Sequence, residues 1–175
     1  KDSFIAGADV SEIQSIQSRS IEDAYNASQM GKEIFAKIAN LRFNTVAAIN
    51  GICLGGGTEL TLACKYRVAS ENAKIGLPEI KLGFVPGWGG CVRLPRLIGL
   101  MNALDLIMTG KVLDAKKAWK LGVVSEVVSS ANLRDRAIEI AEKGGARTCG
   151  AAPKAVVMRL LLEKNASVRV GEPEL

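Results

Sequence analysis

The chain has 175 residues, of which 48% are hydrophobic and 23% charged, and its net charge is +5. This length is enough for one domain with its own core. No apolar run approaches the roughly 18 residues of a membrane helix, which excludes a helical span of a bilayer. The mild basic excess is compatible with RNA, a membrane surface or a polyphosphate ligand, but the lysines and arginines form no dense block.

Histidine is absent, and the four cysteines form no CxxC pair. A zinc site with the usual spacing is therefore unsupported, and no Ser-His-Asp triad or Cys-His pair can exist within the chain. Acid/base catalysis has to use carboxylates, lysines, tyrosines or cysteines. We expect Cys53, Cys64 and Cys91 to be buried free thiols, as in a reducing compartment.

Short apolar runs alternate with segments of helical periodicity along the chain. The strands are expected at residues 45–49, 66–69, 75–77 and 123–128, with a further strand end leading into a turn at 4–9. The helices are expected at residues 20–41, 58–64, 88–97, 101–109, 115–121, 131–142 and 153–162. Asp114 is the expected N-cap of the helix at 115–121. This alternation predicts an α/β fold with parallel strand pairing.

Gly55, Gly56 and Gly57 stand between an expected strand and an expected helix. Glycine lets a ligand approach the backbone closely, and the N–H groups at a helix start suit a phosphate or a developing oxyanion. The alternative explanation is a tight turn that needs glycine for packing. The spacing does not match GxGxxG, which disfavours a dinucleotide site.

Glu59 and Glu79 are the candidate acid/base residues. Glu59 falls in the first turn of the helix that follows the glycines, where a carboxylate is also favoured by the helix dipole alone. Glu79 follows Pro78, and a lone glutamate there is most commonly an exposed loop residue. The sequence alone does not show that the two carboxylates meet. Trp88 and Trp119 are expected in the core or in a pocket wall.

Several blocks of the chain resemble the crotonase (enoyl-CoA hydratase/isomerase) superfamily, most of all the hydratase domain of multifunctional fatty-acid β-oxidation enzymes. The blocks occur in family order over residues 4–128. They read Phe4-Ile5-Ala6-Gly7-Ala8-Asp9, Asn50-Gly51-Ile52-Cys53-Leu54-Gly55-Gly56-Gly57-Thr58-Glu59-Leu60, Gly76-Leu77-Pro78-Glu79-Ile80-Lys81-Leu82-Gly83-Phe84-Val85-Pro86-Gly87-Trp88-Gly89-Gly90 and Arg93-Leu94-Pro95-Arg96-Leu97-Ile98-Gly99. Lys65 departs from the family, which usually has Asp after the cysteine.

The resemblance implies a crotonase (ClpP/crotonase-like) spiral of strands and helices. It implies a partial core at residues 1–128, which lacks the family's N-terminal part, and a C-terminal helical part of the same domain at 129–175. It also implies addition of water to 2-enoyl-CoA thioesters in fatty-acid β-oxidation, with Glu59 and Glu79 as the acid/base pair. The backbone N–H groups of Ala8 and Gly56 would form the oxyanion hole. The implied substrate-binding residues are Gly7, Gly55, Gly57, Pro86 and Gly87.

No separate cofactor is implied, because coenzyme A is part of the substrate. The implied assembly is a homotrimer or hexamer, or a multifunctional β-oxidation complex. The implied location is the bacterial cytoplasm, or the mitochondrial matrix if the source is eukaryotic, and any targeting segment is expected to lie outside this chain.

Three alternatives remain open at this point. One is an enoyl-CoA isomerase or another crotonase chemistry, although such isomerases typically keep fewer of the carboxylates. Another is an inactive structural fragment. The third is an RNA-binding homologue, for which nucleic acid would need a basic cluster such as Lys111, Lys116, Lys117 and Lys120.

Overall fold

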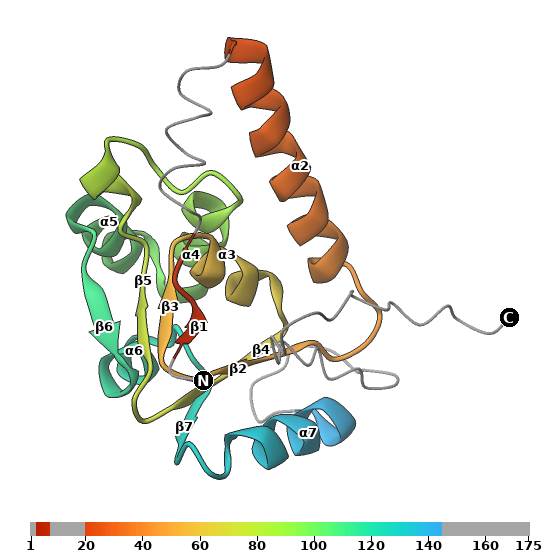
Figure 1. Ribbon diagram of the computed structural model, residues 1–175. Coiled ribbons are helices and arrows are strands. Elements are labelled where there is room, and N and C mark those ends of the chain that lie inside the picture. The colour runs from red at the N-terminus through yellow and green to blue at the C-terminus, as the bar shows by residue number, and fades with distance from the viewer. Residues whose placement is uncertain (1–2, 8–19, 145–175) are drawn as a thin grey trace, which may run out of the picture.

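The computed structural model describes residues 3–7 and 20–144, and these form an α/β fold with two sheets (Figure 1). One sheet has the order β1-β3-β5-β6, formed by Ser3–Ile5, Ile52–Leu54, Lys74–Gly76 and Val112–Asp114. The other has the order β2-β4-β7, formed by Val46–Ile49, Tyr66–Ser70 and Glu126–Val128.

The strands from β1 to β5 alternate between the two sheets. β2 enters the three-stranded sheet, the chain turns at Gly51 with a φ of 68°, and β3 enters the four-stranded sheet. The next turn of the chain repeats this step with β4 and β5, so that β4 pairs parallel to β2 and β5 pairs parallel to β3. This stacking of turns is a spiral, and it confirms the predicted crotonase fold and its parallel pairing. Only β5 and β6 pair antiparallel among the described strands.

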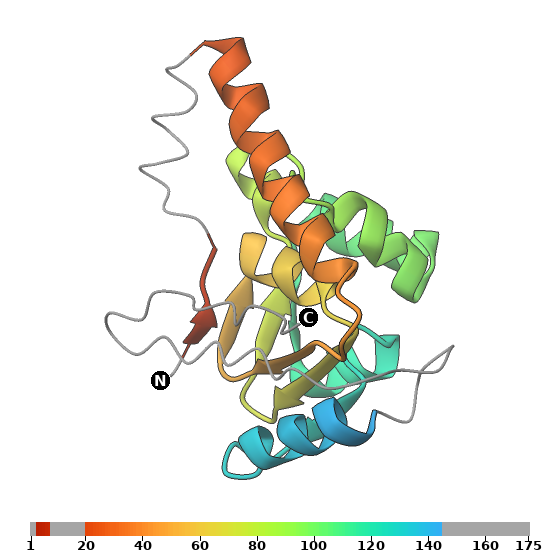
Figure 2. The ribbon, with the colours of Figure 1, turned by 90° about the vertical axis from the view of Figure 1, so that its right-hand side faces the viewer.

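The helices surround the sheets and include one 3₁₀ turn, η1. Their bounds are Ile21–Ala39 for α2, Gly56–Ala63 for α3, Glu79–Leu82 for η1, Gly90–Ile98 for α4, Leu100–Thr109 for α5, Ala115–Leu121 for α6 and Leu133–Lys143 for α7. Figures 1 and 2 both show α2 projecting past the sheets, with its C-terminal half beside α3.

Local signals explain where several helices begin. The Ser20 hydroxyl accepts a hydrogen bond from the Asp23 N–H and caps α2. Asp114 accepts from the Lys117 N–H and caps α6, as the sequence predicts, and Gly122 follows its last turn in a left-handed conformation. These elements form where periodicity and capping agree.

The core has two parts. The larger cluster lies among the two sheets and helices α3 to α6, and the smaller one lies between α7 and the β2-β4 pair. The smaller cluster consists of Val46, Tyr66, Val68, Leu133, Ala137, Ile140 and Ala141. Helix α7 is thus attached to the three-stranded sheet by buried apolar contacts.

Several local expectations from the sequence need correction. β3 and β6 are strands that the sequence did not predict, because their pairing with neighbouring strands makes them strands. Cys91 is exposed, because it lies on the outer side of the first turn of α4, while Cys53 and Cys64 are buried as expected. Trp119 is 47% exposed and is not a core residue. The helix expected at residues 153–162 lies outside the described residues.

Candidate active site

The glycine-rich segment joins β3 to α3 through a backbone that only glycine adopts readily. Gly55 caps α3 with a φ of 55° and a ψ of −127°, and its N–H donates to the Gly76 carbonyl oxygen at 3.0 Å. The Thr58 hydroxyl lies 2.8 Å from the carbonyl oxygens of Cys53 and Gly76. Gly56 is the first residue of α3, so its N–H has no partner within the helix. The turn therefore presents a fixed donor beside the end of β3.

Two of these glycines also stand where a side chain would not fit. A Cβ on Gly57 would lie 2.7 Å from the Cβ and the carbonyl oxygen of Ile5 in β1. A Cβ on Gly56 would lie 2.7 Å from Cζ3 of Trp88. Close packing therefore requires glycine at both positions. At Gly56 this requirement adds to the role of the backbone N–H, which has no partner within the helix.

Glu59 is buried in the first turn of α3, with a relative exposure of 2%. Its Oε1 accepts hydrogen bonds from the Trp88 and Gly90 N–H groups, both at 2.8 Å. Burial raises the pKa of Glu59, and the two N–H donors and the Arg93 guanidinium hold part of that rise back. The backbone thus aims two dipoles at one oxygen and favours the ionised form of this carboxyl.

Glu79 is also buried, at 7% exposure, and is not the exposed loop residue that its position after Pro78 suggested. It opens the 3₁₀ turn η1, and its Oε2 has no hydrogen-bond partner in the described structure. Burial raises the pKa of Glu79 to about 7, and the nearby charge of Glu59 adds to this rise. Glu79 is therefore poised to carry a proton near neutral pH.

Both carboxyl groups line one cavity of about 360 Å³. Its wall is otherwise largely apolar and comes from the end of β1, α2, the glycine turn, η1 and the loop before α4. The lining residues are Ala6, Gly7, Ala24, Ala27, Ser28, Leu54, Gly55, Gly56, Glu59, Pro78, Glu79, Leu82, Phe84, Val85, Gly87 and Trp88. A mostly apolar cavity with two convergent carboxyl groups is typical of a small-molecule site.

The structure brings most of the sequence-predicted site residues together. Gly7, Gly55, Gly56 and Gly87 line the cavity with the two glutamates. Gly57 and Pro86 stand behind its wall, where Gly57 contacts Ile5 and the Pro86 carbonyl oxygen accepts from the Cys91 thiol. Ala8 lies outside the described residues.

The apolar part of the wall has no motif in the sequence. Ala24, Ala27 and Ser28 on α2 and Leu82, Phe84 and Val85 in the loop carry no chemical signature of their own. The small residues on one face of α2 are the signal that could have indicated them, because small side chains on a helix face leave room beside it. Trp88 was expected in the core or a pocket wall, and it does line the cavity.

Two further features bear on the alternatives. Among residues 3–7 and 20–144, no group of three or more acidic or cysteine side chains could hold a metal ion, and no helix is long and apolar enough to cross a membrane.

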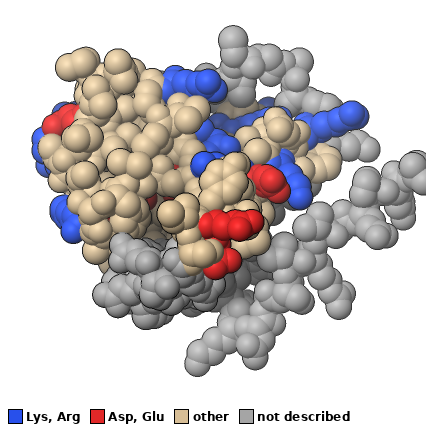
Figure 3. Space-filling model, turned by 90° about the horizontal axis from the view of Figure 1, so that it is seen from above, with Lys and Arg blue, Asp and Glu red and all other residues tan. Residues whose placement is uncertain are grey.

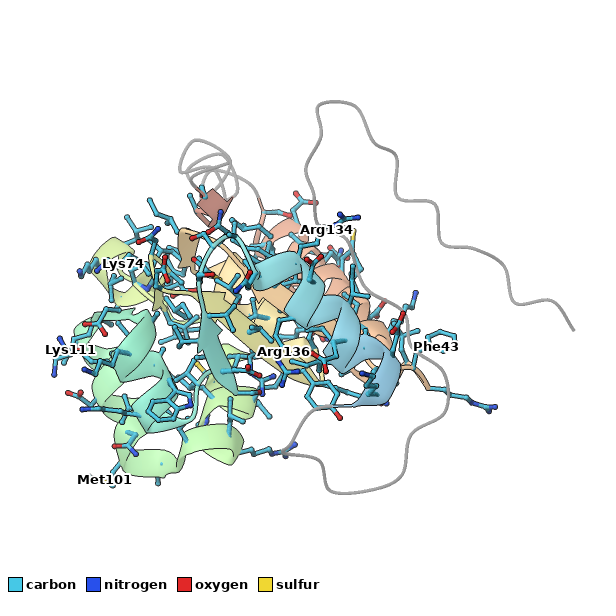
Figure 4. The ribbon with its side chains drawn as sticks, turned by 90° about the horizontal axis from the view of Figure 1, so that it is seen from below. Phe43, Lys74, Met101, Lys111, Arg134 and Arg136 are labelled. Carbon is cyan, nitrogen blue, oxygen red and sulfur yellow. The ribbon has the colours of Figure 1, made fainter. Side chains whose placement is uncertain are left out.

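Two of the four lysines of the basic cluster form ion pairs, Lys111 with Asp105 and Lys117 with Asp114. Figure 4 shows Lys74 and Lys111 on the β5-β6 side, whereas Arg134 and Arg136 belong to α7. The basic residues are thus dispersed.

Comparison with known proteins defines the class to which this fold and site belong. A sequence profile described as "Enoyl-CoA hydratase/isomerase" matches residues 1–167. The fatty acid oxidation complex subunit alpha of Vibrio cholerae is 53% identical over 146 residues, which cover 82% of this chain and 20% of that protein. The chain belongs to the enoyl-CoA hydratase/isomerase family.

Solved structures agree with this assignment. The enoyl-CoA hydratase from Bacillus anthracis is 45% identical with a TM-score of 0.71, and the match covers 78% of this chain and 52% of that one. The enoyl-CoA hydratase from Thermoplasma volcanium is 35% identical with a TM-score of 0.73, covering 79% and 55%. The chain therefore spans about a fifth of the curated relative and about half of these structures.

Proposed function

We propose that the protein is an enoyl-CoA hydratase that adds water across the double bond of a 2-enoyl-CoA thioester in fatty-acid β-oxidation. The observation that carries the proposal is that Glu59 and Glu79, far apart in the sequence, line one mostly apolar cavity. Addition of water needs proton transfer at two carbons and charge stabilisation on the thioester oxygen. Two carboxyl groups and a backbone N–H at a helix start match these needs without histidine.

The different surroundings of the two carboxyl groups suggest different roles. Glu59, with two N–H donors on Oε1, acts as the base that takes a proton from the attacking water. Glu79, with a pKa near 7 and no partner on Oε2, acts as the acid. When their surroundings give two carboxyl groups different pKa values, one can act as the base and the other as the acid.

The proposed hydration begins at the β-carbon of the substrate. The water oxygen bonds to this carbon, and its proton passes to Glu59. The electrons of the double bond move toward the thioester, whose oxygen accepts hydrogen bonds from the N–H groups of Gly56 and Ala8. Glu79 delivers its proton to the α-carbon, and a proton transfer from Glu59 to Glu79 through solvent restores both groups. A preorganised N–H donor of this kind contributes about 3 kcal/mol to the transition state.

The remaining site residues have positioning roles in this proposal. The backbones of Gly7, Gly55 and Gly87 bound the cavity beside the reacting carbons, while Gly57 and Pro86 support its wall from behind. Coenzyme A enters as part of the substrate, and no separate cofactor is required. We expect the protein to act in a multifunctional β-oxidation complex or a homo-oligomer, and the Vibrio and Shewanella relatives favour the bacterial cytoplasm over the mitochondrial matrix.

The direct test is hydration of crotonyl-CoA by the full-length protein, followed as loss of the absorbance of the conjugated thioester. The proposal expects turnover to 3-hydroxybutyryl-CoA without added metal or redox cofactor. If the folded protein binds butyryl-CoA and yet hydrates no enoyl-CoA, the hydratase assignment is wrong, and migration of the double bond would then point to an isomerase.

A further inference from the structure

One face of α2 borders the cavity in its N-terminal half and packs against Trp88 further along. Ala24, Ala27 and Ser28 line the cavity, and Gly31 and Phe35, the next residues on the same face, contact the indole of Trp88 instead. Figure 2 shows this helix running lengthwise past α3. The cavity therefore ends, in the direction of the α2 C-terminus, at the Trp88 side chain.

The indole is held firmly in this position. Its five-membered ring lies against Gly31, which is buried and has no room for a Cβ, and its six-membered ring lies against Gly56. The Phe35 ring meets the indole edge-to-face, with centroids 5.7 Å apart. The backbone of Trp88 is also held: its main-chain N–H donates to Oε1 of Glu59, and its carbonyl oxygen accepts a hydrogen bond from the Arg93 guanidinium at 2.9 Å. Two glycines, an aromatic ring and the backbone thus leave the indole little freedom to move aside.

The chemistry of the wall indicates what reaches this end of the cavity. Between the carboxyl groups and the indole, the wall consists of small or apolar side chains from α2 and from the loop at Leu82 to Val85. Seen from above, a broad part of the surface is uncharged, and several charged side chains gather to one side of it (Figure 3). The described lining of the cavity contains no lysine or arginine, so these residues offer no cationic side chain to the phosphates of coenzyme A. An apolar acyl chain matches this lining better than the charged nucleotide does.

We propose that the Trp88 indole, wedged between Gly31 of α2 and Gly56 of α3, is the stop that limits the length of the acyl chain. This inference rests on the proposed function, because it takes an acyl-CoA thioester as the ligand. Each methylene that enters an apolar cavity improves binding about fourfold. In the wild type this gain ends where the chain meets the indole, so short acyl groups are favoured. Without the indole, the cavity continues along α2 toward Phe35.

The test measures dissociation constants of the full-length protein for saturated butyryl-CoA and decanoyl-CoA, which bind without reacting. In Trp88→Ala, the affinity ratio of decanoyl-CoA to butyryl-CoA should rise at least tenfold over the wild-type ratio. Trp88→Phe, which keeps an aromatic ring and is less demanding for folding, should give a smaller rise in the same direction. Trp119→Phe changes the exposed tryptophan and serves as the matched control, with no change in the ratio.

Each outcome is decisive. An unchanged ratio in both Trp88 variants, or an equal shift in Trp119→Phe, would overturn the stop. A raised ratio in a protein that hydrates no enoyl-CoA would support the stop while the hydratase proposal fails. Hydration of crotonyl-CoA with an unchanged ratio would do the reverse. Failure of the wild type to bind any acyl-CoA would overturn both proposals.

Discussion

Glu59 and Glu79 are the same residue type, but their surroundings favour different protonation states of the carboxyl group. Both are buried, and burial is the largest cause of the raised pKa in each. Two N–H groups donate to Glu59, whereas Glu79 has an oxygen without a partner in the described residues. The donors and the Arg93 charge at Glu59, together with the charge of Glu59 beside Glu79, therefore separate the proposed base from the proposed acid.

The pKa of Glu79 predicts the pH dependence of the reaction. An acid must be protonated to act, and this carboxyl loses its proton at about pH 7. We expect kcat/KM for crotonyl-CoA to fall as pH rises above about 7, approaching tenfold per pH unit. The measurement is a pH profile of hydration by the full-length protein. A rate that keeps rising through about pH 9 would contradict the assignment of Glu79 as the acid.

The same shift predicts a pH-dependent stability. The folded pKa lies above the ordinary value of 4.5, so the folded state holds a proton that the unfolded state releases between about pH 4.5 and 7. The free energy of unfolding of the wild type therefore falls as pH rises through this window. Glu79→Gln removes the ionisation, and its stability relative to the wild type should improve by up to about 3 kcal/mol between pH 4.5 and 8.

Urea denaturation at both ends of this pH range measures the effect, with Glu71→Gln as control because Glu71 is exposed. If the free energies of unfolding of Glu79→Gln and the wild type differ by the same amount at every pH in the range, the pKa of Glu79 is not raised in the folded protein.

At the scale of the elements, the close contact between β1 and α3 depends on Gly57. Gly57→Ala would drive a methyl group into Ile5, at a point where the backbone carbonyl cannot yield easily. We expect a loss of about 1–3 kcal/mol in the free energy of unfolding. In Gly87→Ala, by contrast, the new methyl group would have only the Ser28 hydroxyl at 3.8 Å, so that variant is the matched comparison. Equal stability of the two variants would show that β1 moves freely.

The sequence predicted those elements whose signals are local. Residues 20–41 and the helix capped by Asp114 were predicted because periodicity and caps act within one segment. β3 and β6 were missed because their pairing partners, not their three residues, make them strands. The burial of Glu79 and the exposure of Cys91 were likewise missed, since both depend on which segments pack over them. The juxtaposition of the two glutamates was available only through the family resemblance.

At the scale of the whole molecule, Arg67 joins three parts of the fold. Its guanidinium is buried and donates to the carbonyl oxygens of Val123, Cys64 and Thr61 at 2.9, 2.7 and 3.4 Å. It thereby links β4 to the end of α3 and to the segment before β7. Burial of the charge lowers the pKa of Arg67, but these acceptors compensate for the lost water.

Loss of Arg67 should therefore destabilise the whole domain. We expect Arg67→Ala to reduce the free energy of unfolding by about 3 kcal/mol, because three buried acceptors lose their donor. Arg96→Ala, at an exposed position on α4, should change it by less than about 0.5 kcal/mol. Thermal and chemical unfolding of the two variants would distinguish them. A loss in Arg67→Ala no larger than in Arg96→Ala would contradict the linking role.

The central claim is that Glu59 and Glu79 together add water to an enoyl thioester. The most direct test is the rate of crotonyl-CoA hydration by the full-length protein and its Glu59→Gln, Glu79→Gln and Glu71→Gln variants. The account predicts that kcat falls about 10²–10⁴-fold in each of the first two and stays at the wild-type value in the third, while butyryl-CoA still binds to all. Near wild-type hydration in a folded Glu59→Gln or Glu79→Gln variant would contradict it.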